Sequence, residues 1–211
     1  MNSEIKDYRT ILSDLDAMYV TLHKDMIFCQ QRQQEDKVIW RRMYVRASFA
    51  FIEAFSFYLK QHAFNQTLVA VYDSFKQGSG HIPSRDLALL NDESYCLSDK
   101  GEAKIEKAKL RTIPNLLFAL SSFAKSIGSD YVAMKDDAGY ESLTMAIKIR
   151  DKLTHPKDVQ SLEVTDEQVR IVTTAIEWVQ REYVRILANV PGGVTIQEYE
   201  SQPPSQTCPK P

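Results

Sequence analysis

The chain has 211 residues, of which 44% are hydrophobic, 26% charged and 10% aromatic, a composition typical of a globular protein. This composition excludes a collagen-like, fully disordered or disulfide-scaffold chain. Lysine and arginine total 26 against 28 aspartates and glutamates, so the net charge of -2 provides no attraction of the whole molecule to nucleic acid or an anionic membrane. A site for a polyanion must therefore be local.

The sequence lacks the usual signatures of metal centres, phosphate loops and membrane segments. The cysteines, Cys29, Cys96 and Cys208, have no CxxC spacing, and the four histidines are dispersed. There is no glycine-rich phosphate loop, no HExxH and no GxSxG. No run of about 18 apolar residues is present. We therefore expect a cytoplasmic protein with no membrane segment, no metal and no cofactor.

Apolar residues recur at alternating steps of three and four in the first part of the chain, which is the period of amphipathic helices. A first stripe runs from Ile5 to Cys29, with Ser3 as its expected N-cap. A second helix is predicted over residues 38–63 and can extend through Phe75. The second helix is apolar over most of its circumference, as expected of a helix at the centre of a bundle.

Capping and helix-breaking residues define the next two helices. Pro114 suits the first turn of a third long helix, and Gly128 marks the end of that helix. A fourth helix follows Gly139 and ends at or just before His155, because Pro156 moves the preceding residue out of the helical region.

A capping box of Thr165 and Gln168 starts a fifth helix, which stops at Val190. Residues 77–111 form an irregular insert, with a short helix expected around 84–91 and no convincing alternating strand pattern. The sequence thus predicts an all-α bundle of four to five long helices.

This bundle is predicted to form one domain over residues 1–190, with the irregular insert at about 77–111. The remaining residues, 191–211, are rich in proline. We expect them to form a disordered tail.

A charged residue lies where the fourth helix should bury an apolar one. Arg150 shares a helix face with Leu143 and Ile147. Arginine is almost never fully buried alone, so this position requires a carboxylate, a phosphate or a subunit boundary. His155 follows at the end of the helix. The two residues either form a functional pair or a structural pair at the helix end.

Glu53 is a second charged residue in an apolar setting, between Ile52 and Ala54 of the second helix. An unpaired buried carboxylate would be costly. We therefore expect a partly buried carboxylate with a cationic partner, or a residue close to a functional site.

The run from Ile149 to Lys157, IRDKLTHPK, resembles the RxxxxH signature of HEPN domains (higher eukaryotes and prokaryotes nucleotide-binding). The resemblance covers residues 38–63 and 113–187. Many members of that superfamily are metal-independent endoribonucleases, including toxins of toxin-antitoxin and abortive-infection systems. In these enzymes the motif pairs across a two-fold dimer.

The resemblance implies that Arg150, Asp151 and His155 form the catalytic set, with RNA as the substrate, a homodimer as the active form and an antitoxin as a further partner. Histidine can transfer the protons and arginine can face the charge on phosphorus, whereas Asp151 would orient either of them. Glu53 is a candidate supporting residue. Basic residues near the motif are candidates for binding RNA: Lys148, Lys152, Lys157 and Arg46, together with Arg41 and Arg42.

Other readings of the same residues remain open. Lys148 and Lys152 can form a solvated helix face, and Arg46 can pair with a carboxylate. The whole chain can be a non-catalytic HEPN-like module that binds a nucleotide, RNA or a protein. It can also be a helical adaptor that recruits a partner through its tail.

Overall fold

The computed structural model describes residues 8–77 and 84–190, so Ser3 and the 191–211 tail lie outside the described residues. The elements along them are α1 (Tyr8–Gln31), a 3-10 turn (Arg32–Gln34), α2 (Lys37–Gln77), α3 (Ser84–Leu90), β1 (Glu93–Leu97), β2 (Ala103–Lys107), α4 (Thr112–Ser126), α5 (Ala138–Thr154), a 3-10 turn (Gln160–Leu162) and α6 (Asp166–Ala188). The fold is all-α, as predicted.

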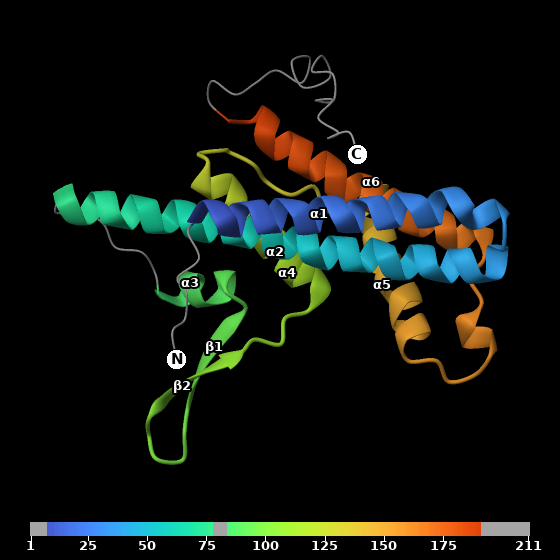
Figure 1. Cartoon of the computed structure of the whole chain (residues 1–211), viewed down its shortest axis with the longest axis horizontal. Helices are drawn as coiled ribbons and strands as arrows, with labels where there is room; N and C mark the ends of the chain where they lie inside the picture. Colours follow the sequence, from blue (N-terminus) through green and yellow to red (C-terminus); the bar gives the residue numbers. More distant parts are fainter. Residues whose placement is uncertain (1–7, 78–83, 191–211) are drawn as a thin grey trace, which may run out of the picture.

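Helix α2 is the centre of the fold. Helix α1 runs beside it, and α4, α5 and α6 contact it from other directions (Figure 1). These helices bury most of its apolar residues between Tyr44 and Ala63, which explains why that part of α2 is apolar over most of its circumference, whereas Val38, Ile39 and Met43 near its start are exposed. Its buried apolar residues from Tyr44 to Leu59 are Tyr44, Val45, Phe49, Phe51, Ile52, Ala54, Phe55 and Leu59.

The helix ends follow the capping residues in the sequence. Helix α4 ends before Gly128, which adopts a positive φ of 71°. Helix α6 begins with the predicted capping box between Thr165 and Gln168. Helix α5 ends at Thr154, immediately before His155 and Pro156. These three predictions are confirmed.

The insert at 77–111 is more regular than predicted. Helix α2 continues to Gln77 and α3 forms where a short helix was expected, but β1 and β2 form an antiparallel hairpin. The absence of a strand pattern was therefore a wrong prediction. Neither face of the hairpin is buried against the core. Its strands are therefore not required to show the clean alternation of apolar and polar residues that marks a strand with one buried face.

A buried carboxylate fixes the segment that leads into α5. Glu182 of α6 is fully buried and accepts hydrogen bonds from Tyr131 Oη at 2.8 Å, Met134 N at 3.0 Å and Arg185 Nη1 at 2.7 Å. Burial, followed by the hydrogen bond and charge of Glu182, raises the pKa of Tyr131, which therefore stays protonated and donates. These bonds attach residues 131–134 to α6.

The start of α5 also packs closely on α6. A Cβ atom at Gly139 would lie 2.7 Å from Cδ1 of Trp178, closer than atoms can approach. The indole Nε1 of Trp178 donates to the carbonyl of Met134 at 3.1 Å. Because Gly139 has no side chain, the two helices approach closely enough to bury Trp178 completely.

An ion pair of a buried lysine joins α2 to the hairpin and to α4. Lys60 is fully buried; its Nζ forms an ion pair with Asp92 and donates to Asn115 Oδ1 at 2.9 Å. Asp92 has a positive φ of 56°, and its carbonyl accepts a hydrogen bond from Ala108 N at 2.6 Å. Lys60 therefore attaches the base of the hairpin to the core.

Replacing Asp92 with asparagine should destabilise the fold by about 3 kcal/mol, because the buried Lys60 ammonium would lose its counterion. Asparagine tolerates the positive φ of this position, so the change isolates the charge. Lys60→Met should cost less than Asp92→Asn, since it removes the buried charge altogether. Urea denaturation followed by circular dichroism measures both values.

Glu167→Gln is the matched control, because it removes the exposed ion pair between Glu167 and Arg170. It should change the free energy of unfolding by less than about 0.5 kcal/mol. An Asp92→Asn protein as stable as this control would show that the Lys60 pair contributes nothing.

Candidate functional site

Arg150 lies near the end of α5, where α5 meets α2 and the start of α4. Its side chain is 23% exposed, and Nη2 donates to Thr112 Oγ1 at 2.8 Å. The guanidinium carbon lies 5.2 Å from the centre of the Phe49 ring, within the range of a cation-π contact. The Nε atom is buried and has no hydrogen-bond partner among the described residues. The predicted position of Arg150 toward the core is confirmed.

Two carboxylates lie beside the guanidinium. Glu53 Oε1 is 3.8 Å from Nη2, and Asp151 Oδ1 is 3.4 Å from Nη1. The predicted cationic partner of Glu53 is thus Arg150, but the predicted partial burial is wrong, because the Glu53 side chain is 61% exposed. Successive residues turn by 100° around a helix, so the apolar neighbours Ile52 and Ala54 do not bury the carboxylate between them.

Arg150 and Asp151 line an open pocket of about 520 Å³. The pocket is closed on its other sides by residues 110–114, which lead into α4, and by Ile147 of α5. Its polar groups are two guanidinium groups, those of Arg150 and Arg111, one hydroxyl and one carboxylate. This combination suits an anionic ligand that one carboxylate can orient.

His155 terminates α5 and is exposed. Its backbone N–H donates to the carbonyl of Asp151 at 2.9 Å, and its φ of -124° and ψ of 62° leave the helical region. The described part of the chain provides no hydrogen bond or ion pair to its imidazole. Five residues turn by about 140° beyond one full circle of a helix, so the backbones of Arg150 and His155 lie on different sides of α5. The pocket that Arg150 lines does not include His155.

The lysines next to the motif lie on the side of α5 away from Arg150. Lys148 and Lys152 are both exposed, and each is about 160° around the helix from Arg150 but much closer to the direction of His155. Lys157, in the segment after α5, is also exposed. The two lysines of α5 therefore lie on the side of the helix closer to His155 than to Arg150.

The segment after His155 is held by a turn of its own. Asp158 accepts hydrogen bonds from Ser161 N at 2.7 Å and Ser161 Oγ at 2.6 Å. These bonds, assisted by the positive charge of Lys152, lower the pKa of Asp158. The carboxylate stays charged near neutral pH, and the turn that it stabilises sets the path of the chain between His155 and α6.

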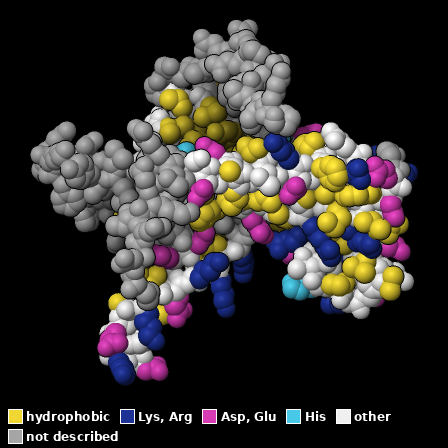
Figure 2. Space-filling model, viewed as in Figure 1, with side chains coloured by type: hydrophobic (Ala, Val, Ile, Leu, Met, Phe, Trp, Pro, Cys, Tyr) yellow, Lys and Arg dark blue, Asp and Glu magenta, His cyan; other side chains and the backbone are white. Residues whose placement is uncertain are grey.

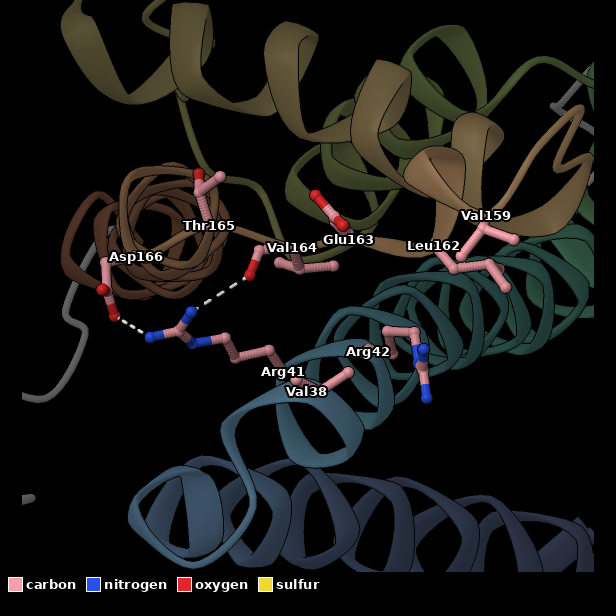
Figure 3. Close-up of a pocket in the computed structure, with 9 residues that line it drawn as sticks. All are labelled: Val38, Arg41, Arg42, Val159, Leu162, Glu163, Val164, Thr165 and Asp166. Atoms are coloured by element: carbon pink, nitrogen blue, oxygen red, sulfur yellow. Dashed lines mark hydrogen bonds and ion pairs between the residues drawn. The ribbon is translucent and has the colours of Figure 1, made fainter.

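The arginines at the start of α2 have separate roles. Arg41 donates to the carbonyl of Val164 at 3.2 Å and forms an ion pair with Asp166, so it holds the start of α6 (Figure 3). Arg42 lines the same pocket, of about 530 Å³, and extends away from this pair. Within the described ranges, Arg42 and Arg46 have no ion pair, so these residues give no support to the alternative that Arg46 pairs with a carboxylate.

Helix periodicity places Arg42 and Arg46 on the face of α2 on which Arg150 packs, two turns and one turn before Phe49. Arg42, Arg46, Phe49 and Glu53 follow steps of four, three and four and share one face of α2. Arg150 packs on that face at Phe49. Figure 2 shows Lys and Arg side chains gathered beside α2, on the side where α5 and the segment after it lie.

Several contacts of the site could not be found in the sequence. Thr112 and Phe49 resemble ordinary helix-start and core residues, and only the packing of α4 and α2 brings them to Arg150. Among the described residues, no group of three His, Cys, Asp or Glu side chains could hold a metal ion. In the same part of the chain, no helix is both long and apolar enough to cross a membrane.

Comparison of the chain with protein-family models, with curated proteins and with solved structures gives no match. The site is therefore interpreted from its own residues and geometry.

The hydrogen bond to Thr112 should stabilise Arg150 more than the carboxylate of Glu53 does. Thr112→Val should cost about 1 kcal/mol in the free energy of unfolding, because it leaves a partly buried guanidinium N–H without its acceptor. Glu53→Gln should cost less than about 0.5 kcal/mol, since that pair is long and exposed. Chemical denaturation of the two variants tests this order, and Thr112→Ser should recover most of the loss. The opposite order would make Glu53 the residue that holds Arg150.

Proposed function

We propose that this protein is an RNA-cleaving bundle of HEPN type, which acts without a metal at a site completed by a second copy of the chain. The observation that carries the proposal is the position of Arg150. Its guanidinium is fixed by Thr112 and Phe49, yet it still lines an open pocket. A fixed cation at an accessible surface can stabilise the negative charge that develops on the phosphate in the transition state of RNA cleavage.

His155 would supply the proton transfer. Histidine is the side chain most often used for general acid-base catalysis, because its imidazole can both accept and donate a proton. In the proposed reaction, one imidazole takes the proton of the RNA 2'-hydroxyl, the 2'-oxygen attacks phosphorus, and a second imidazole protonates the leaving 5'-oxygen. The products are a 2',3'-cyclic phosphate and a 5'-hydroxyl.

The separation of Arg150 and His155 within one chain supports a composite site. The backbones of the two residues lie on different sides of α5, and each chain carries one such histidine. A two-fold dimer would provide two imidazoles and two guanidinium groups to a shared cleft. RNA contacts would come from the exposed Lys148, Lys152 and Lys157 beside His155 and from Arg46 of α2.

The same proposal gives the remaining residues supporting roles. Asp151 and Glu53 flank the guanidinium and would orient it, and neither would transfer a proton in the reaction. A cytoplasmic toxin or phage-defence nuclease, neutralised by an antitoxin protein, is the biological setting that this activity would fit.

A second function is favoured by a different observation. Arg150 already has two carboxylates and a hydroxyl within its own chain, which reduces the positive charge available to phosphate. These contacts fit a non-catalytic module in which Arg150 is structural and the exposed basic residues bind RNA, a nucleotide or a protein.

His155→Ala should abolish RNA cleavage without changing stability, because the imidazole is exposed and contacts no polar group of the described chain. The assay is incubation of a fluorescent RNA with EDTA, followed by gel analysis and a test for 2',3'-cyclic phosphate ends. Arg150→Ala should also abolish cleavage, at a cost in stability that denaturation measures.

Arg170→Ala is the matched control, because Arg170 is an exposed arginine of α6 that pairs with Glu167. It should cleave RNA like the unaltered protein. Cleavage that survives His155→Ala and Arg150→Ala would refute the nuclease assignment. Binding of the RNA without any turnover by the unaltered protein would instead support the non-catalytic module.

A further inference from the structure

The β1–β2 hairpin extends away from the helices, with its tip remote from them (Figure 1). In its register, Tyr95 lies opposite Ile105 and Leu97 opposite Ala103, so these four side chains share one face. Tyr95 and Ile105 are each 60% exposed and Leu97 is 75% exposed. The hairpin thus presents an apolar face that the described part of the chain leaves uncovered.

The outer edge of β2 also has backbone groups available. Ser98 N donates to Glu102 O at 2.8 Å, and Ala108 N donates to Asp92 O at 2.6 Å, so these facing residues are hydrogen-bonded pairs of the hairpin. Hydrogen-bonded and non-hydrogen-bonded pairs alternate along an antiparallel ladder. Ala103, Ile105 and Lys107 of β2 belong to the non-hydrogen-bonded pairs, and their backbone N–H and C=O groups therefore point away from β1. No described strand pairs with that edge.

We propose that this edge binds the same edge of a second copy, so that two β2 strands pair antiparallel about a two-fold axis at Ile105. Ile105 is the middle residue of β2 and one of those whose backbone groups point outward. Pairing there gives a four-stranded sheet in the order β1-β2-β2-β1 without moving either strand.

The order of charges in β2 fits this register. The strand reads Ala103-Lys104-Ile105-Glu106-Lys107, so the two-fold pairing places Lys104 opposite Glu106 of the second copy, and the reverse. These are the pairs without mutual backbone hydrogen bonds, in which side chains lie closest. Charges on an edge strand normally discourage pairing, but this order makes the strand complementary to itself.

The apolar faces of the two hairpins also become continuous. Tyr95 and Ile105 of one copy form a row with Ile105 and Tyr95 of the other. The outer edge of β1 provides no such match, because a two-fold pairing about Tyr95 would place Glu93 opposite Leu97 and Ser94 opposite Cys96. The geometry therefore selects β2 as the contact.

Charge exchange on β2 tests the proposal. The unaltered chain should associate reversibly in sedimentation velocity over a concentration series. Lys104→Glu or Glu106→Lys should each weaken self-association about tenfold, because each places like charges opposite each other twice. A mixture of the two variants should associate as well as the unaltered protein, since every pair is then opposite in sign. Lys100→Glu, at the hairpin turn, is the matched control and should have no effect.

A cross-link tests the register independently. Ile105→Cys should form an intermolecular disulfide, because facing residues that exchange backbone bonds are about 5.5 Å apart at Cα, within the range of a disulfide. Lys107→Cys, on the same strand face, should not form one, because Lys107 faces Ala103 of the second copy. The unaltered chain controls for the native cysteines.

The proposal would be overturned if Lys104→Glu and Glu106→Lys left the affinity of self-association unchanged, or if the unaltered chain were a monomer at every concentration. A cross-link through Tyr95→Cys but not through Ile105→Cys would show pairing through β1 and would also overturn it. A monomer at every concentration would also remove the second copy that the proposed nuclease requires. Failure of the charge exchange or of the Ile105→Cys cross-link alone would leave the nuclease proposal standing, because neither measurement involves the Arg150 and His155 face.

Discussion

The burial of α2 among the other long helices is the constraint on which the rest of the structure depends. A helix covered from several directions has little freedom to rotate or slide, because its side chains interlock with each neighbour. Its polar positions are therefore fixed as firmly as its apolar ones. This is how Lys60 can be held, fully buried, against Asp92 and Asn115, and how Phe49 can provide a fixed surface for the guanidinium of Arg150.

The site at the end of α5 is built from this fixed helix outward. Glu182 and Gly139 determine where α5 begins, and the packing of α5 on α6 and α2 determines the direction of Arg150. Asp158 and Arg41 then hold the chain between α5 and α6. His155 precedes both of these contacts in the chain and is exposed, at the point where the backbone leaves the helix. A fixed guanidinium and an exposed imidazole thus belong to residues whose backbones lie on different sides of one helix.

The sequence predicted the helices well because helix formation depends on local features. The three-four spacing of apolar residues, the Thr165–Gln168 capping box, Gly128 and Pro156 each act within a few residues. The hairpin was missed because its alternation is not coupled to burial: Tyr95 and Leu97 alternate with Ser94 and Cys96, but neither face is covered by the core. The periodicity of a strand is informative only where one side is buried.

The sequence alone determined that Arg150 would lie on the inward face of a helix ending at His155, because helix periodicity requires it. A cationic partner for Glu53 was predicted from the cost of burying an unpaired carboxylate, and this reason does not apply to the exposed side chain. Only the tertiary structure decided that this partner is Arg150, that Glu53 is exposed, and that Thr112 and Phe49 complete the contacts of the guanidinium. It also left Arg42 and Arg46 without ion pairs among the described residues. These outcomes depend on how distant helices pack, and packing is decided by the fit of many side chains at once rather than by any local pattern.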